Sequence, residues 1–289
     1  MNRKLLFFLL SSLILCSCSF NKTNSGNSIS TLESSILESS SLITKEEYLI
    51  YQEEIKIYGN LYKPENYSED TSYPLIIMSH SANVNSDTLN SYARRSASLG
   101  YLVYTFDFPG SSSSSRSTNI PLCTIFTEID TLSFIVDYFS FTSNINKIFL
   151  FGTSQGGLVS SVVADEKADE KEDLISGLIL FYPAYNIPET ILKFPSLSDK
   201  EYVEQLKDYN VYDHIGKFKK DVLIVHGTSD FMVPYSYSER ANELYEHSTL
   251  FLVEGANHGF NKENHYFNDN YDVLTWSYAS SYLIDHYLN

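Results

Sequence analysis

Residues 149–157 constrain the fold of this chain most, because they place a serine between a strand-like run and a helix-like run. The run before the serine, residues 147–151, is apolar, and residues 158–164 after it are typical of a buried helix. Between them stands Gly152-Thr153-Ser154-Gln155-Gly156, a Gly-x-Ser-x-Gly pattern. Glycines two residues either side of the serine let a strand and a helix approach closely at a sharp turn. The alternative is an ordinary Gly/Ser turn between two core elements.

Strand-like and helix-like segments alternate through most of the chain. A first pair of strands is expected within residues 48–62, with Tyr58-Gly59-Asn60 as the turn between them. Further strands are expected at residues 74–79, 101–106, 147–151, 175–181, 222–225 and 249–253, and helices at 86–99, 121–139, 158–164, 236–246 and 271–287. This order predicts an α/β protein with a mainly parallel central sheet flanked by helices.

Residues 184–219 interrupt the alternation. They contain no strand-like run, are rich in aromatic residues and have helical character only at residues 199–206. We predict a small cap inserted between two strands, above the edge of the sheet. Phe194, Tyr202 and Tyr209 are predicted to line an apolar substrate pocket. The alternative is that these rings only pack against the edge of the sheet.

Three candidate catalytic residues each follow the C-terminal end of an apolar strand. Ser154 follows residues 147–151, Asp230 follows residues 222–225, and His258 follows residues 249–253. The C-terminal ends of parallel strands meet at one edge of a sheet, where active sites form. The order Ser, Asp, His along the chain is the one expected for α/β-hydrolases. A turn aspartate and a loop histidine are the alternatives for the last two residues.

The motifs around these residues resemble those of the α/β-hydrolase superfamily over residues 47–289. They are Gly152-Thr153-Ser154-Gln155-Gly156, His226-Gly227-Thr228-Ser229-Asp230 and Gly255-Ala256-Asn257-His258-Gly259-Phe260. Within the superfamily they are similar to small-cap esterases of the feruloyl/cinnamoyl esterase type, and also to peptidase-like and lipase-like relatives. The resemblance implies an α/β-hydrolase fold with a small cap insertion.

The resemblance also implies a role for each site residue. Ser154 attacks an acyl carbonyl, His258 takes the serine proton, and Asp230 orients the imidazole. The backbone N–H groups of Gln155 and Ala82 would bind the oxyanion. The sequence departs from the family beside Ala82, where Ser81 replaces a glycine, and at residues 111–115, a serine run expected to be a flexible loop.

The chain offers no pattern for a cofactor or a nucleic acid. No His, Asp and Glu grouping has the spacing of metal ligands, and no nucleotide-binding glycine loop follows the first strand. With 36 acidic and 20 basic residues, the net charge is −16, which repels phosphate backbones. We therefore expect a small-molecule ester as the substrate, no cofactor, no metal and no nucleic acid.

The first residues resemble a bacterial lipoprotein signal. Arg3 and Lys4 precede an apolar run too short to span a bilayer. Leu15-Cys16-Ser17-Cys18 then resembles a lipobox, which implies that Cys18 becomes the lipidated first residue of the mature chain. We predict a signal peptide at residues 1–17, a Ser/Asn/Thr-rich tether at 18–44 and the folded domain at 45–289. A secretory signal with an incidental cysteine is the alternative.

These observations predict a serine esterase held by a lipid anchor on the extracytoplasmic face of the cell membrane. A small aromatic cap favours short-chain or aromatic acyl groups, which would pass through an acyl-enzyme intermediate. A serine peptidase or an acyltransferase on the same scaffold is one alternative. A non-catalytic surface-binding lipoprotein that kept the fold is the other. The oligomeric state does not follow from the sequence.

Overall fold

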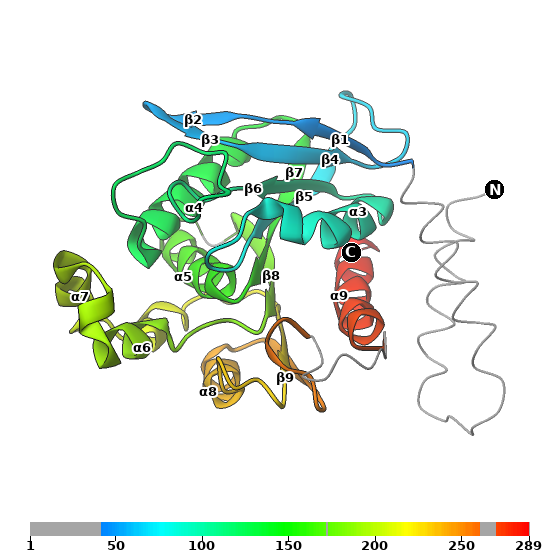
Figure 1. Cartoon of the computed structure of the whole chain (residues 1–289). Helices are drawn as coiled ribbons and strands as arrows, with labels where there is room; N and C mark the ends of the chain where they lie inside the picture. The colour runs from blue at the N-terminus through cyan, green and yellow to red at the C-terminus, as the bar shows by residue number, and fades with distance from the viewer. Residues whose placement is uncertain (1–41, 172, 261–269, 289) are drawn as a thin grey trace, which may run out of the picture. The chain divides into compact units, whose positions relative to one another are not determined.

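The computed structural model describes residues 42–171, 173–260 and 270–288 (Figure 1). Its central sheet has eight strands in the order β1-β4-β6-β5-β7-β8-β9-β10, and β2 (Ile50–Gln52) and β3 (Ile55–Ile57) form a separate hairpin. The sheet strands are β1 (Thr44–Glu47), β4 (Gly59–Lys63), β5 (Tyr73–Ser79), β6 (Leu102–Phe106), β7 (Ile145–Thr153), β8 (Ile175–Phe181), β9 (Val222–Gly227) and β10 (Ser248–Val253). All pairings from β6 to β10 are parallel, whereas β1 and β4 run antiparallel to their neighbours.

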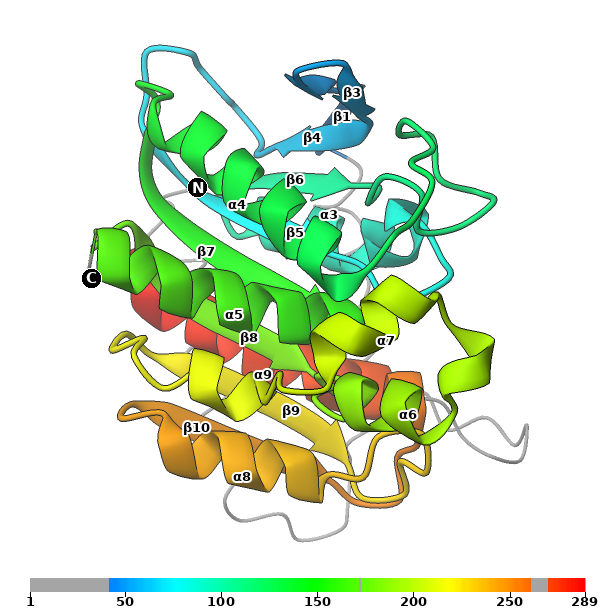
Figure 2. The same ribbon diagram turned by 90° about the vertical axis from the view of Figure 1, so that its left-hand side faces the viewer.

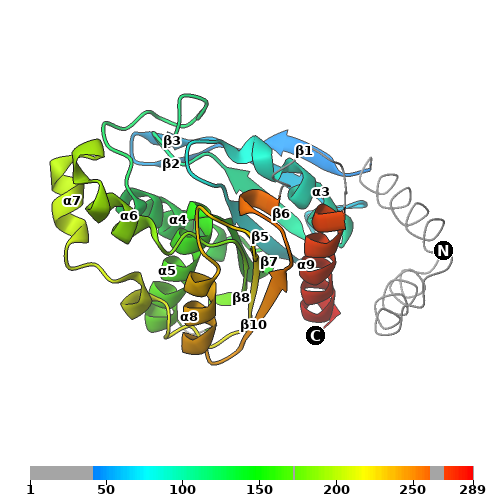
Figure 3. The ribbon, with the colours of Figure 1, turned by 60° about the horizontal axis from the view of Figure 1, so that its bottom comes forward.

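Helices cover both faces of the sheet (Figures 2 and 3). On one face lie α4 (Ile125–Ser140), α5 (Gln155–Glu170) and α8 (Ser236–Leu244), and on the other lie α3 (Asn90–Ser98) and α9 (Asn270–Leu288). Every residue of β5 and β6 is buried, as expected for parallel strands packed on both sides. This arrangement confirms the predicted α/β class.

The first hairpin differs from the prediction. Its turn lies at Glu53 and Glu54, and Glu53 has a positive φ of 54°. Gly59, the predicted turn residue, instead begins β4, and a Cβ added to it would lie 2.3 Å from the Tyr104 ring. The glycine therefore makes room for a neighbouring aromatic side chain, which is a tertiary requirement that local turn patterns do not reveal.

The segment between β8 and β9 has two short helices, α6 (Ile187–Lys193) and α7 (Lys200–Leu206), and two 3₁₀ turns, η2 (Pro195–Leu197) and η3 (Val211–His214). In Figure 2 the parallel strands point toward the side of the molecule on which α6 and α7 lie. The segment predicted as a cap is therefore helical and sits near the C-terminal ends of the strands.

The N-terminal boundary of the folded part lies slightly before residue 45. β1 begins at Thr44, and the Ile43 side chain is only 6% exposed and packs in the core. The signal peptide, Cys18 and nearly all of the predicted tether lie outside the described residues. In the part of the chain that the structure describes, no helix has the length and apolar character needed to cross a membrane.

Candidate active site

Ser154 stands at a strained turn between β7 and α5. Its φ is +52° and its ψ is −118°, a conformation that L-residues rarely adopt. Close packing leaves no room for side chains at the flanking glycines. A Cβ on Gly152 would lie 2.3 Å from the Gly156 carbonyl oxygen, and one on Gly156 would lie 2.3 Å from the Ser79 carbonyl oxygen. The pattern of glycines thus allows β5, β7 and α5 to meet beneath the serine.

Two backbone hydrogen bonds hold this turn in place. The Ser154 N–H donates to the Phe181 carbonyl at the end of β8, at 2.9 Å, and the Ala184 N–H donates to the Ser154 carbonyl, also at 2.9 Å. The end of β8 and the start of the helical segment after it therefore support the strained serine.

The three predicted catalytic side chains form one hydrogen-bonded chain. His258 Nε2 lies 3.0 Å from Ser154 Oγ, and His258 Nδ1 lies 2.7 Å from Asp230 Oδ2. A carboxylate only accepts hydrogen bonds, so the imidazole proton belongs on Nδ1 and Nε2 is free to accept the serine O–H. This is the arrangement in which a serine can lose its proton to histidine as it attacks an electrophile.

Asp230 is held by four hydrogen-bond donors. Its Oδ1 accepts the N–H groups of Met232 (3.0 Å) and Val233 (2.8 Å), and its Oδ2 accepts from His258 and from His226 Nε2 (3.2 Å). Burial alone would raise the pKa of Asp230, but the hydrogen bonds from His226, His258 and Val233 outweigh it and hold the pKa well below its usual range. The carboxylate therefore stays ionised at neutral pH.

Tyr182 completes the environment of the histidine. Its ring meets the His258 imidazole edge-on, with centroids 4.8 Å apart, and its own φ is +40°. Only 7% of Ser154 and 4% of Asp230 is exposed, so the chemistry would occur in a recessed site. Sequence reasoning missed Tyr182. Its position directly after a strand that ends at the active edge was the available signal.

The two residues predicted to bind the oxyanion line one cavity beside Ser154. Gln155 begins α5, and Ala82 belongs to the loop after β5. His80 connects this loop to the next one, because its Nε2 accepts the Phe108 N–H at 3.1 Å and its Nδ1 donates to the Ser81 carbonyl at 2.7 Å. Burial lowers the pKa of His80, which suits these neutral-imidazole contacts.

Ser81, the residue before Ala82, contributes a contact of its own. Its hydroxyl lies 3.0 Å from the Thr153 hydroxyl, next to the nucleophile. The loop that carries Ala82 is thereby attached to the end of β7. This side-chain contact joins the loop to the strand end near Ser154.

The serine run after β6 is held by hydrogen bonds. Hydroxyl groups of Ser112, Ser115 and Ser117 donate to the carbonyls of Val84, Phe108 and Asp107. Arg116 places its Nε 2.9 Å from Asp107 Oδ2 and lies 4.1 Å above the Tyr58 ring. The prediction of a flexible loop did not anticipate these contacts, because serine content alone does not reveal which carbonyls the hydroxyls meet.

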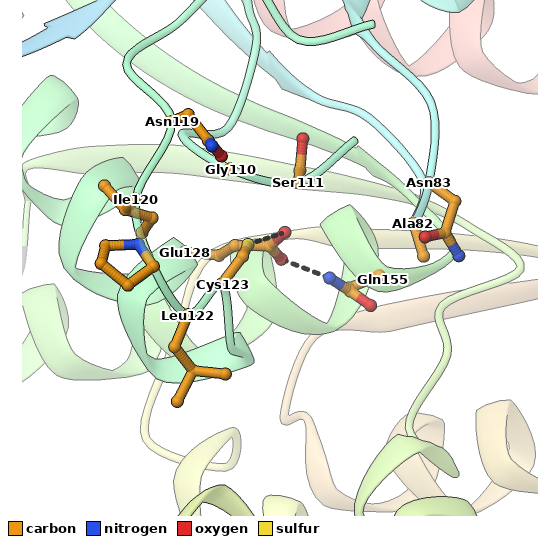
Figure 4. A pocket seen from close by; sticks show the side chains of 11 residues that line it. Ala82, Asn83, Gly110, Ser111, Asn119, Ile120, Leu122, Cys123, Glu128 and Gln155 are labelled. Carbon is orange, nitrogen blue, oxygen red and sulfur yellow. Dashed lines mark hydrogen bonds between the residues drawn. The ribbon is translucent and has the colours of Figure 1, made fainter. Parts of the chain in front are cut away.

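A cavity of about 460 Å³ is lined by Gln155, the residue after the nucleophile, and by Ala82 (Figure 4). Its wall combines the loop after β5, the loop after β6, and the first turns of α4 and α5. The lining residues are Ala82, Asn83, Gly110, Ser111, Asn119, Ile120, Pro121, Leu122, Cys123, Glu128 and Gln155. Polar side chains thus make up much of the wall.

The cap residues predicted to bind substrate lie elsewhere than in this wall. Tyr202 is 7% exposed, and its hydroxyl accepts the Ile125 N–H at 3.3 Å. Tyr209 meets Phe126 edge-on at 5.0 Å, and Phe194 is 52% exposed. The contacts of the two tyrosines join the cap to the start of α4, which favours the alternative that they have a packing role.

Glu128 is a buried residue of the cavity wall and was missed in the sequence. Its Oε2 accepts from Gln155 Nε2 at 2.7 Å, its Oε1 lies 3.5 Å from Cys123 Sγ, and only 2% of the residue is exposed. Burial raises the pKa of Glu128 to about 7. The available signal was an acidic residue three positions after Ile125, on the same helix face as the apolar residues Ile125, Ile129 and Leu132.

Among the described residues, Cys123 does not offer a second nucleophile. Burial raises the pKa of the Cys123 thiol to about 12, so this cysteine is a poor nucleophile at neutral pH. Within residues 42–171, 173–260 and 270–288, no group of three or more His, Cys, Asp and Glu side chains could hold a metal ion.

Comparison with known proteins agrees with this architecture. Residues 71–211 match the family model described as serine aminopeptidase, S33. No curated protein matches the chain.

Several solved structures share the fold. Est1E from Butyrivibrio proteoclasticus, solved with ferulic acid bound, is 24% identical, with 82% of this chain and 98% of that chain covered and a TM-score of 0.66. A monoacylglycerol lipase from Paleococcus ferrophilus is 17% identical, with 80% and 99% covered and a TM-score of 0.55. A dienelactone hydrolase from Anabaena variabilis is 16% identical, with 85% and 99% covered and a TM-score of 0.59. The sheet, the serine turn and these similarities together identify the chain as a protein of the α/β-hydrolase fold.

Proposed function

We propose that the protein is a serine hydrolase that cleaves carboxylic esters through an acyl-enzyme intermediate. The observation that carries the proposal is the hydrogen-bonded chain from Ser154 through His258 to Asp230 at a strained turn. Such a hydrogen-bonded triad lets the histidine remove the serine proton, which makes the serine a nucleophile at neutral pH.

The reaction would proceed in two halves. Ser154 Oγ attacks the ester carbonyl while its proton passes to His258 Nε2, and the carbonyl oxygen becomes an oxyanion between the N–H groups of Gln155 and Ala82. The tetrahedral intermediate collapses, the bond to the alcohol oxygen breaks, and His258 returns the proton to that oxygen. Water then repeats the sequence on the acyl-serine and releases the acid. Asp230 stabilises the imidazolium in both halves.

We propose an ester rather than a peptide as the substrate because of the solved structures that share the fold. Ferulic acid is bound in Est1E, and a monoacylglycerol lipase is also among the similar structures. The family model that matches is described as a serine aminopeptidase, so peptide hydrolysis is the second candidate. A cavity of about 460 Å³ lies at the smaller end of the range for small-molecule sites, which favours short or aromatic acyl groups over long chains.

A fluorophosphonate probe tests the reaction type. We expect it to label the wild-type protein and the Ser160→Ala control, whose serine lies buried on α5, but not Ser154→Ala. A panel of p-nitrophenyl esters of increasing chain length, with methyl ferulate and an aminoacyl anilide, then separates esterase from peptidase. Turnover of the anilide alone would contradict the ester proposal.

We also propose that the protein acts at the cell surface, attached through a lipid on Cys18. The support is the resemblance of Leu15-Cys16-Ser17-Cys18 to a lipobox. Two acyl chains on one residue suffice for stable attachment, whereas one is marginal.

A further inference from the structure

The lining of the cavity bears on which half of an ester it could receive. His258 Nε2 must return a proton to the alcohol oxygen, so the alcohol has to lie beside this nitrogen. Ala82 and Gln155, which flank the nucleophile, line the cavity, whereas Ser154, His258 and Asp230, all within the described residues, do not. An ester whose carbonyl oxygen meets the N–H groups of Ala82 and Gln155 would therefore direct its acyl half into the cavity and its alcohol half toward the histidine.

The wall of the cavity has two kinds of surface. Ile120, Pro121 and Leu122 supply apolar side chains at one side, while Asn83, Ser111, Asn119, Gln155 and Glu128 supply polar groups. Figure 4 shows the Glu128 carboxyl group joined by hydrogen bonds to Cys123 and Gln155. A purely hydrocarbon acyl chain would leave these polar groups without partners.

Glu128 keeps acceptor capacity for a ligand. A carboxyl group, protonated or ionised, has lone pairs beyond the two contacts shown for Glu128, which are to neutral donors, the Gln155 amide and the Cys123 thiol. Among the ion pairs of the described residues, none includes Glu128, although the residue is 2% exposed. A buried carboxyl group without a cation gains from any further hydrogen-bond donor brought to it.

We propose that this cavity is the acyl-binding subsite and that Glu128 is its specificity-determining residue, selecting short acyl groups that carry a hydroxyl hydrogen-bond donor. The inference rests on the proposed function, because it assigns the cavity to the acyl half of an ester. It also assigns a second task to Gln155. The backbone N–H of that residue would bind the oxyanion, while its side chain donates to the Glu128 carboxyl group that would bind the acyl group.

The test compares two acyl groups of nearly equal size, 6-hydroxyhexanoyl and heptanoyl, as p-nitrophenyl esters. We expect wild-type kcat/KM to be about tenfold higher for the hydroxylated ester, the effect of one buried hydrogen bond to a carboxyl group. Glu128→Leu should bring the ratio to one or below. Glu128→Gln, which keeps an acceptor and the contact with Gln155, should retain part of the preference. Asp130→Asn, an exposed acid on the same helix, should leave the ratio unchanged.

A binding measurement makes the result independent of turnover. Calorimetry on Ser154→Ala should show 6-hydroxyhexanoate binding about tenfold more tightly than heptanoate, and adding Glu128→Leu should remove the difference. Equal binding of the two acids, or a hydroxyl preference that survives Glu128→Leu, would overturn the role of Glu128. A wild-type protein that binds the hydroxy acid selectively but cleaves no ester would contradict the proposed function alone. If Glu128→Leu does not fold, Glu128→Gln carries the test, and a preference as strong as that of the wild type in this variant would overturn the role of Glu128.

Discussion

Asp230 accepts hydrogen bonds from two histidines that have different roles in this site. Its two oxygens accept four hydrogen bonds, two from backbone N–H groups and two from histidines. His258 also reaches Ser154, whereas His226 donates to Asp230 and lies 2.7 Å from Ser238 Oγ through its other nitrogen. One histidine therefore moves protons in the proposed reaction, and the other holds the carboxylate in position.

Ser154→Ala and His258→Ala should each lower kcat by about 10⁴-fold or more, because residues of such a triad act as a unit. Asp230→Asn should cost somewhat less, because the nucleophile and its base remain, although the amide no longer holds the imidazole proton on Nδ1. Turnover of a p-nitrophenyl ester measures the effect, with circular dichroism as the control for folding. Near-wild-type turnover by His258→Ala would remove histidine from the mechanism.

Glu128 makes a prediction about pH and stability. Its folded pKa of about 7 lies above the ordinary value of 4.5, so the folded state favours the protonated carboxyl. The free energy of unfolding is therefore highest, as far as Glu128 is concerned, below pH 4.5. It falls as the pH rises from 4.5 through 7, by about 3 kcal/mol in total. Glu128→Gln cannot ionise and should be more stable than the wild type at pH 8.5 and comparable to it at pH 5. Urea unfolding at both values measures the difference, and an equal difference at the two would refute the assignment.

At the scale of elements, the junction of β5, β7 and α5 depends on glycines that leave room for close backbone contact. Gly156→Ala would place a Cβ 2.3 Å from the Ser79 carbonyl, and neither backbone can move without shifting Ser154. We expect a loss of about 1–3 kcal/mol in unfolding free energy together with a large loss of kcat. Gly216→Ala is the control, because the nearest atom to its Cβ would lie 3.9 Å away. Thermal unfolding and turnover are measured together, and retention of both by Gly156→Ala would contradict the packing argument.

The elements also show what a sequence reveals and what it hides. The serine turn, Asp230 and His258 could be predicted because local patterns and strand ends specify them. The role of Gly59 could not, because the Tyr104 ring that requires it is 45 positions away along the chain. Tyr202 and Tyr209 were predicted to line a pocket from the aromatic content of their segment. Aromatic content does not say which surface a ring meets, and in the structure both tyrosines contact the start of α4.

At the scale of the whole molecule, the proposed lipid anchor would fix where the reaction occurs. Cys18→Ser should release the protein from the membrane fraction or leave the signal unprocessed, because no other residue would receive the two acyl chains. Cys16→Ser serves as the matched control and should change little. Fractionation with mass spectrometry of the N-terminus measures both. A cleaved, unlipidated Cys18→Ser chain that stayed in the membrane fraction would contradict the proposed lipid anchor.

The order of strands in the sheet has a consequence for the timing of synthesis. From β7 onward, β8, β9 and β10 each join the same edge in the order in which they are made. Ser154 arrives with β7, but its proposed base follows β10, 104 residues later. A growing chain thus carries its nucleophile long before it has an acid–base partner. Hydrolytic competence would appear only when the last strand pairs, and a chain cut short after β9 would be inert.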